Sequence, residues 1–220
     1  MSARTSIPAL SDYQEYPPSQ ELADHFICLW TQVIGGDREH THRVVPDGCI
    51  DIVCIADEPP NVVGPWTEPF AITFAPGTRI TGARLRPGHA PGVLGIPAAE
   101  LLNRSALLSA VWNGKRTAPF VQVAEERDAA ARRLALSKVL VRSIDSVGPP
   151  DETVVAGMRW LARHPHGRVE DFSHLIGISK RQLHRRFCGT RLWTKDVSVS
   201  ASIPAAPAFR RERMRSGLAS

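Results

Sequence analysis

The chain has 220 residues, of which 43% are hydrophobic, and a formal net charge of +5 at pH 7. This length suffices for one domain of moderate size and a second, small one. No run of eighteen or more apolar residues occurs, which excludes a membrane-spanning helix. The opening stretch MSARTSIPALSDYQEYPP lacks the apolar core of a signal peptide, so we expect a cytoplasmic protein with no membrane partner.

Charge is divided unevenly along the chain. Residues 1–150 contain 14 Lys and Arg against 16 Asp and Glu, whereas residues 151–220 contain 13 against 6. A basic excess confined to the C-terminal third is typical of an appended module that binds a polyanion. The same composition fits a tail that only keeps the chain soluble, so composition leaves both interpretations open.

From about residue 20 to residue 90 the sequence is β-like. The turn signal Pro46-Asp47-Gly48 precedes a β-branched run from Cys49 to Ile55, and the short runs that follow each close with Gly or Pro. Alternate residues of RITGARLRPG are expected on opposite faces of one strand, with Ile80, Gly82 and Arg84 on the first and Thr81, Ala83 and Leu85 on the second. Regular short strands separated by such turns favour a small barrel or sandwich.

From Pro97 the hydrophobic period becomes helical. We predict one helix over PAAELLNRSALLSAVW and a second over ERDAAARRLALSKVLVRSI, whose arginines should lie opposite its apolar face. The segment DSVGPPDE, from Asp145 to Glu152, then combines a glycine and two prolines with acidic residues. We place the domain boundary in this segment.

Three more helices are predicted beyond this boundary. Asp151 is positioned to cap a helix that Pro165 ends, and two short helices then flank Gly177, where a left-handed turn costs a glycine nothing. The apolar positions expected to face inward are Val169, Phe172, Leu175 and Ile176 in the first short helix and Leu183 and Phe187 in the second. This is the arrangement of a helix-turn-helix unit, whose second helix enters the major groove of DNA.

The last predicted helix carries side chains suited to reading DNA. Ser179 is expected as its N-cap, which leaves backbone amides suited to a phosphate. The side chains that point outward are Lys180, Arg181, Gln182, His184, Arg185 and Arg186. Arginine can donate a bidentate pair to guanine and glutamine to adenine, while contacts to phosphates add affinity without sequence preference. The alternative is an amphipathic helix with a solvated basic face.

The segment VEDFSHLIGISKRQLHRRF resembles the first helix-turn-helix of AraC/XylS-type transcription regulators, whose pattern is close to LA..LGLS.R.L.R.F....G. The matching positions are Phe172, Ile176, Gly177, Ile178, Ser179, Arg181, Leu183, Arg185 and Phe187, and Ser173 stands where the family usually has Ala. The resemblance implies that three side chains face bases, namely Arg181, His184 and Arg185. It implies that two others, Lys180 and Arg186, lie nearer to phosphates.

Upstream segments extend this resemblance. VVPDGCIDIV, VVGP and GARLRPGHAPGVLGIPAAELLN are similar to the N-terminal domain of a subset of these regulators, so the resemblance runs from about Tyr16 to Gly189. Family members then continue with a second helix-turn-helix, but here the prolines of TRLWTKDVSVSASIPAAPAFRRERMRSGLAS prevent a helix. One choice of codons for residues 191–197, shifted by one base, encodes the Gly-Tyr-Gly-Pro-Lys-Thr of the missing unit. We hypothesise a frameshift near Thr190, with a natural disordered tail as the alternative.

Two other clusters are candidate ligand sites. His40 and His42 lie beside the β-rich region, as in the metal-binding strand of cupin barrels, but the glutamate that such a site needs is missing. We therefore expect no metal, and interpret Asp47 as a turn residue that bonds its own backbone. The stretch RLRPGHAPG would bind an anionic effector through Arg84 and Arg86, or form a rigid connector in which Arg86 closes a salt bridge. We favour the connector.

The cysteines and tryptophans give no clear sign of a metal site, an effector site or a catalytic centre. Cys28, Cys49, Cys54 and Cys188 match no zinc spacing and are expected to be buried free thiols. The tryptophans Trp30, Trp66 and Trp112 would either line an effector pocket or pack in the core, which is the commoner fate. No Gly-rich phosphate loop, nucleophile elbow or activated nucleophile is present. We expect neither an enzyme nor a cofactor.

The sequence therefore predicts an α+β fold. A β-rich sensor or dimerisation domain is expected over residues 15–148, a helix-turn-helix module over 151–189 and an irregular or disordered tail over 190–220. The predicted function is that of an AraC/XylS-type transcription regulator, whose sequence-specific DNA binding is impaired by loss of the second unit. The alternative is a truncated regulator that keeps only ligand binding or dimerisation. Double-stranded DNA is the main expected partner, with a small-molecule effector and a homodimer as further candidates.

Overall fold

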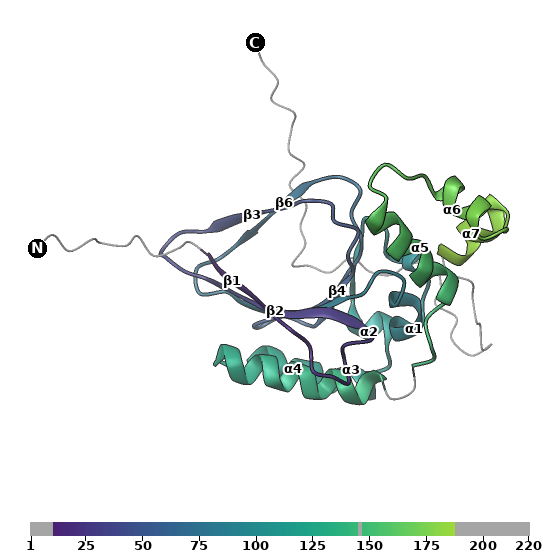
Figure 1. Cartoon of the computed structure of the whole chain (residues 1–220). Helices are drawn as coiled ribbons and strands as arrows, with labels where there is room; N and C mark the ends of the chain where they lie inside the picture. Colours follow the sequence, from purple (N-terminus) through teal and green to yellow (C-terminus); the bar gives the residue numbers. More distant parts are fainter. Residues whose placement is uncertain (1–10, 145–146, 188–220) are drawn as a thin grey trace, which may run out of the picture.

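The computed structural model describes residues 11–144 and 147–187 (Figure 1). Its strands are β1 (Ser11–Tyr16), β2 (Phe26–Ile34), β3 (His40–Val44), β4 (Asp51–Ile55), β5 (Asn61–Val63), β6 (Phe70–Phe74), β7 (Arg79–Leu85) and β8 (Ser105–Leu107). Its helices are α1 (Ala90–Leu94), the 3-10 helix η1 (Ala98–Leu101), α2 (Leu108–Val111), α3 (Gly114–Glu125), α4 (Ala129–Ile144), α5 (Glu152–Arg163), α6 (Val169–Leu175) and α7 (Lys180–Phe187). A β-rich N-terminal region followed by helices confirms the α+β class.

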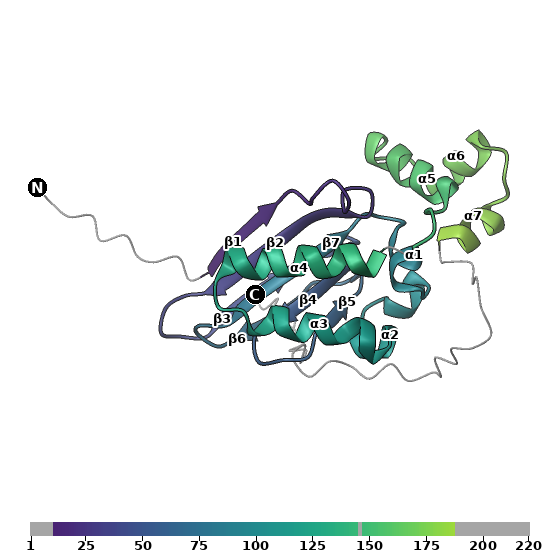
Figure 2. The same cartoon turned by 90° about the horizontal axis from the view of Figure 1, so that it is seen from below.

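The strands form two antiparallel sheets. The larger has the order β1-β2-β7-β4-β5-β8, and the smaller consists of β3 paired with β6. In Figure 1 the pair β3–β6 lies above the larger sheet, whereas α3 and α4 lie below it, and Figure 2 shows these two helices side by side across the strands. The larger sheet is therefore covered on one face by helices and on the other by the smaller sheet.

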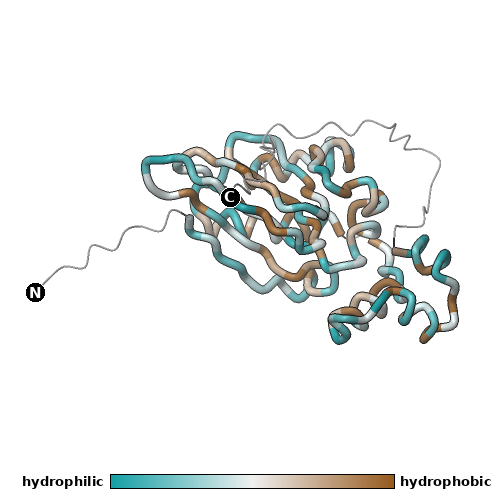
Figure 3. Tube along the Cα trace, turned by 90° about the horizontal axis from the view of Figure 1, so that it is seen from above, coloured by the Kyte–Doolittle hydropathy of each residue, from teal (hydrophilic) through white to brown (hydrophobic). Residues whose placement is uncertain are grey.

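The central strand β7 shows why the two faces of the larger sheet differ. Ala83 and Leu85 belong to the main hydrophobic core, which the sheet shares with α3 and α4. Ile80 and Arg84 point to the other face, toward β3 and β6. The predicted alternation of the two faces along RITGARL is thus confirmed. Figure 3 shows hydrophobic and hydrophilic segments interspersed along the tube of the β-rich region.

The long helix α4 was predicted, but the position of one arginine was wrong. Leu136 and Leu140 are fully buried against the sheet, as expected. Arg132 is also fully buried rather than opposite the apolar face. Its Nε donates to Thr81 Oγ1 at 2.5 Å and its Nη1 donates to the Glu126 carbonyl at 3.0 Å. These two hydrogen bonds offset part of the cost of burying a guanidinium group.

The helix predicted from Pro97 is wrong. The segment folds instead as η1, the short strand β8 and the four-residue helix α2. Asn103 takes a positive φ of 56°, which interrupts a right-handed helix. Residues 105–107 then pair with β5, so the larger sheet gains its last strand there. Pairing with the sheet outweighed the local helical pattern, and α3 was not predicted at all.

The helices α5, α6 and α7 pack on one another at one end of the sheet (Figure 1). Asp151 caps α5 as predicted, because its Oδ1 accepts hydrogen bonds from the backbone of Thr153 at 2.9 Å and Val154 at 3.2 Å. Gly157 lets the other helices approach, since a Cβ there would lie 2.7 Å from Phe187 Cζ and 2.9 Å from Phe172 Cε1.

The helix α5 contacts the loop that follows β7. A Cβ on Gly88 would lie 2.8 Å from Val154 Cγ1, and Val154 is buried. This loop begins at Arg86, whose Nε donates to the Ala23 carbonyl at 2.7 Å. The salt bridge suggested for Arg86 is therefore replaced by a backbone hydrogen bond.

The helix α4 ends at Ile144 and α5 begins at Glu152. The predicted domain limits, residues 15–148 and 151–189, stay a prediction.

In the two described ranges, no helix is both long enough and apolar enough to cross a membrane.

Candidate functional site

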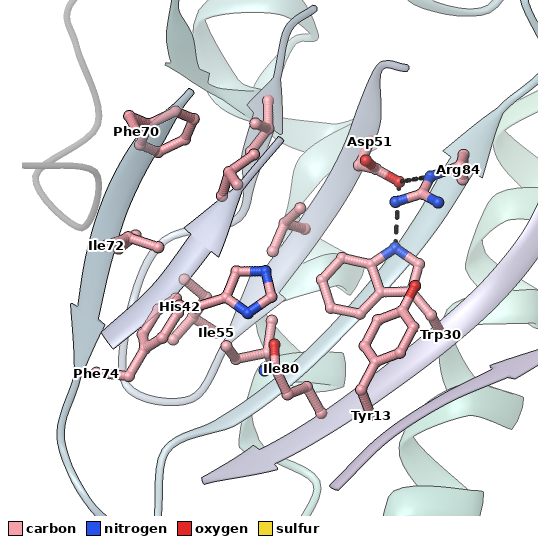
Figure 4. A pocket seen from close by; sticks show the side chains of 14 residues that line it. Tyr13, Trp30, His42, Asp51, Ile55, Phe70, Ile72, Phe74, Ile80 and Arg84 are labelled. Atoms are coloured by element: carbon pink, nitrogen blue, oxygen red, sulfur yellow. Dashed lines mark hydrogen bonds and ion pairs between the residues drawn. The ribbon is translucent and has the colours of Figure 1, made fainter. Parts of the chain in front are cut away.

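A cavity of about 200 Å³ lies between the larger sheet and the β3–β6 pair (Figure 4). Most of its wall is apolar, and the apolar lining residues are Val44, Val53, Ile55, Val63, Phe70, Ile72, Phe74 and Ile80. The remaining lining residues are Tyr13, Trp30, Gln32, His42, Asp51 and Arg84. An apolar wall with a few convergent polar groups is the usual character of a small-molecule site.

Three of these residues, Tyr13, Trp30 and Arg84, gather around Asp51 (Figure 4). Asp51 Oδ1 accepts hydrogen bonds from Trp30 Nε1 at 3.1 Å and from Arg84 Nε at 3.3 Å. Arg84 also forms ion pairs with Glu15 Oε1 at 3.5 Å and Asp47 Oδ2 at 3.8 Å. Tyr13 donates its hydroxyl to Glu15 at 2.6 Å. One guanidinium group thus meets three carboxylates at this end of the cavity.

Trp30 holds its place because its neighbour on β7 has no side chain. Trp30 pairs with Gly82 across the β2–β7 ladder. A Cβ on Gly82 would lie 2.3 Å from both Cε2 and Cζ2 of the indole ring. Tyr13 covers the ring at a centroid distance of 5.7 Å. The glycine therefore sets the indole against the sheet, where its N–H reaches Asp51.

Burial shifts the pKa of several groups here. Burial raises the pKa of Asp51 to about 6, although Arg84 and the Trp30 hydrogen bond act in the opposite direction. Burial and the hydrogen bond to Glu15 raise the pKa of Tyr13, so its hydroxyl stays a neutral donor. Burial and the neighbouring His40 lower the pKa of His42. At neutral pH the site thus holds an ionised Asp51 and a neutral imidazole.

The raised pKa of Asp51 predicts a pH-dependent stability. In an unfolded chain an aspartate has a pKa of about 3.9. Between about pH 4 and pH 6 the folded protein keeps a proton that the unfolded chain has released, so the free energy of unfolding falls as the pH rises. The variant Asp51→Asn lacks this titration and should gain up to about 3 kcal/mol relative to wild type across that window.

Denaturant unfolding of both proteins from pH 4 to pH 7 measures this gain. Asp57→Asn is the matched control, because Asp57 is exposed and its positive φ of 65° suits asparagine. The stability difference between Asp57→Asn and wild type should stay constant over the same window. A constant difference for Asp51→Asn as well would contradict the assignment.

Sequence reasoning found only parts of the cavity. The sequence makes Arg84 a candidate anion-binding residue and His42 a candidate metal ligand, and the structure brings both into one apolar cavity (Figure 4). Asp51 and Tyr13 were missed. A signal existed for Asp51, because it alternates with Val53 and Ile55 along β4 and so shares their face.

The other clusters singled out in the sequence contribute less. Of the three tryptophans, Trp30 lines the cavity, while Trp66 packs on Phe70 and Trp112 packs on Phe120. Within residues 11–144 and 147–187, no three His, Cys, Asp or Glu side chains are grouped to hold a metal ion. Asp47 accepts a hydrogen bond from the Cys49 backbone at 2.9 Å, as expected of a turn residue.

The cysteines differ in exposure. Cys28 and Cys54 are buried free thiols, as predicted, whereas Cys49 is a free thiol that is only half-buried. Burial raises the pKa of Cys49 to about 12, so its thiol stays protonated at neutral pH. Cys188 lies outside the described residues.

The second candidate site is the surface of α7. Leu183 is fully buried and Phe187 half-buried, as predicted for the side that packs on α5 and α6. The predicted turn is present, because Gly177 has a φ of +69°. In α6, Phe172 is buried but Leu175 is 68% exposed, so the apolar face predicted there is narrower than expected.

Three outward side chains of α7 are engaged within the protein. Lys180 pairs with Glu170 of α6, and Arg186 pairs with Asp151 Oδ2 at 2.9 Å. Gln182 Oε1 accepts a hydrogen bond from the Ser179 backbone at 2.9 Å, and Ser179 Oγ accepts one from the Gln182 backbone at 3.2 Å. This reciprocal pair is a capping box, which confirms Ser179 as the N-cap.

Arg181 and Arg185 remain on the side of α7 opposite Leu183. They lie four residues apart, so successive turns present them on one face. Both are exposed, and neither takes part in an ion pair within the part of the chain that the structure describes. His184 is exposed beside them.

The predicted tail and the frameshift hypothesis concern residues 190–220, which lie outside the described residues.

Residues 14–106 match the family model DUF6597, a domain of unknown function. This domain is found in the N-terminal region of some AraC-type regulators. The matched stretch contains every residue that lines the cavity except Tyr13, and it ends before α5 to α7. No curated protein and no solved structure matches the chain.

Proposed function

We propose that the chain is a transcription regulator of the AraC/XylS type that binds double-stranded DNA through α7. The observation that carries the proposal is the exposed pair Arg181 and Arg185, held opposite the buried Leu183 at the end of a helix-turn-helix unit. Arginine recognises guanine through paired hydrogen bonds in the major groove. The match of residues 14–106 to a domain found in some AraC-type regulators supports the same proposal.

The pairing of the other side chains refines their proposed roles. Lys180 and Arg186 bind carboxylates of the protein itself, so a phosphate would have to replace Glu170 or Asp151 as their partner. Gln182 holds the cap with its carbonyl oxygen, which leaves its amide N–H groups for contact with DNA. We therefore assign base contacts to Arg181 and Arg185, with His184 beside them.

A salt titration of DNA binding tests the proposal. With a labelled duplex, the binding constant of the wild-type chain should fall as salt rises, since phosphate contacts release counterions. Because each paired hydrogen bond to a base contributes about 1–3 kcal/mol, Arg181→Ala/Arg185→Ala should weaken binding at least tenfold at one salt concentration.

Arg159→Ala/Arg163→Ala is the matched control. It removes the same charge at the same spacing from exposed positions of α5. At the same salt concentration it should change the affinity for DNA less than threefold, because salt screens the attraction between DNA and charges that do not contact it. Equal losses in the two double variants would show that α7 is only a basic surface helix.

The alternative function is ligand binding or dimerisation without productive DNA contact. It is favoured by the loss of the family pattern after Gly189, because one unit reaches one segment of major groove. A second copy of the chain would then have to supply the further contacts. Absence of salt-dependent binding by the wild-type chain, with the cavity still binding a ligand, would establish this alternative.

A further inference from the structure

The end of the cavity around Asp51 offers carboxylate oxygens as hydrogen-bond acceptors. At this end the hydroxyl of Tyr13 is donated to Glu15 and the indole N–H of Trp30 to Asp51. The guanidinium of Arg84 is shared among three carboxylates. Asp51 Oδ1 accepts two hydrogen bonds, whereas Oδ2 accepts none from the described residues.

The charges around Asp51 favour a cationic ligand, which can also donate hydrogen bonds to these acceptors. Arg84 contributes one positive charge, while Glu15, Asp47 and Asp51 contribute three negative ones. An anionic ligand at Arg84 would have to compete with these carboxylates and would be repelled by them. A cation meets an excess of negative charge instead. Glu15 and Asp47 are 47% and 52% exposed, so this end of the cavity lies next to solvent.

The wall of the cavity fits the body of such a ligand. Tyr13 and Trp30 place two aromatic rings beside Asp51, and aromatic faces attract cations. Farther in, Phe70, Ile72 and Phe74 of β6 provide an apolar wall (Figure 4). A cavity of about 150 Å³ accommodates benzene. The volume of about 200 Å³ found here therefore accommodates one ring with a short chain.

We propose that this cavity binds a small organic amine, with its ammonium group hydrogen-bonded to Asp51 and its apolar body against Phe70, Ile72 and Phe74. The ammonium group donates to Asp51 Oδ2 and lies beside the rings of Tyr13 and Trp30. No residue of α7 lines this cavity. Amine binding and DNA binding by α7 are therefore tested separately. Failure of one leaves the other standing.

Three probes of similar size separate the possible ligand classes. They are the cation 2-phenylethylamine, the neutral 2-phenylethanol and the anion 3-phenylpropionate. Calorimetric titration of the full chain at pH 7.5 should give a Kd for the amine that is about tenfold or more below that of either other probe, because a hydrogen bond to a charged group is the strongest contact available. An equal or tighter Kd for the anion would overturn the proposal, as would the absence of amine binding.

A variant at Asp51 locates the ammonium group. Asp51→Asn should weaken amine binding about tenfold or more and leave the affinity for 2-phenylethanol unchanged. The control Asp57→Asn removes an exposed carboxylate and should bind the amine like wild type. Unchanged amine affinity in Asp51→Asn would contradict the assigned contact.

A measurement on the wild-type chain covers the case in which Asp51→Asn does not fold. The indole N–H of Trp30 bonds to Asp51, so its proton resonance reports on a ligand at that carboxylate. Adding the amine should shift this resonance and leave that of Trp112, which does not line the cavity, unchanged. An amine that shifts neither indole resonance would contradict the site.

The pH dependence provides a second check on wild-type protein. A proton on Asp51 competes with the ammonium group, so amine affinity should rise about tenfold per pH unit below pH 6 and level off above it. The titratable and charged groups around this carboxylate are Arg84, Glu15, Asp47, Tyr13, Cys28, Cys49 and, from the smaller sheet, His42. Affinity that is independent of pH between 5 and 7 would exclude Asp51 as the partner.

Discussion

Replacing Gly82 with alanine is expected to lower the free energy of unfolding by about 3 kcal/mol, since inserted core volume forces side chains out of place. The added Cβ would lie 2.3 Å from two atoms of the Trp30 ring, which real contacts do not allow. The indole must therefore move, and its hydrogen bond to Asp51 is lost with it. Denaturant unfolding measures the stability, and the Trp30 indole resonance measures the displacement.

Gly114→Ala is the control for this substitution. Gly114 begins α3 and has no other atom within 4 Å of an added Cβ. Alanine there should be neutral or stabilise by about 0.5–1 kcal/mol, because glycine has more conformational freedom to lose on folding. If Gly82→Ala were as stable as Gly114→Ala, the close contact between β7 and Trp30 would be wrong.

Replacing Leu183 with alanine is expected to destabilise the unit formed by α5, α6 and α7 by about 3 kcal/mol, as for other buried leucines. Leu183 is fully buried and joins α7 to its neighbours. Loss of its side chain leaves a cavity beneath the helix that presents Arg181 and Arg185. Amide hydrogen exchange is the suitable measurement, because it reports opening of these helices separately from the sheet.

Leu175→Ala is the matched control, since Leu175 is the same residue type but 68% exposed. Its effect should stay within about 0.5 kcal/mol, as for most surface substitutions. Equal loss of protection in the two variants would show that α7 does not depend on Leu183 for its position.

Local signals predicted much of the C-terminal unit. Asp151, Pro165, Gly177 and Ser179 each act on the few residues beside them, and a capping or turn residue is recognisable without knowledge of the fold. The buried Leu183 followed from helical spacing. The partners of Lys180 and Arg186 could not be predicted, because Glu170 and Asp151 are brought near them only by packing of the three helices.

Long-range contacts explain the errors in the N-terminal region. Residues 105–107 look helical in sequence, but pairing with β5 makes them a strand. Arg132 has the spacing of a surface residue, yet Thr81 of β7 supplies a partner that permits its burial. The cavity combines residues from every strand from β1 to β7, and no local pattern shows that these strands face one another.

The central claim is that α7 reads DNA sequence, and selection of duplexes from a random pool tests it most directly. The wild-type chain should enrich a short guanine-containing motif that fits one major-groove segment, and Arg181→Ala/Arg185→Ala should enrich none. The control Arg159→Ala/Arg163→Ala should recover the wild-type motif. No enrichment by the wild-type chain, or the same motif from Arg181→Ala/Arg185→Ala, would contradict the claim.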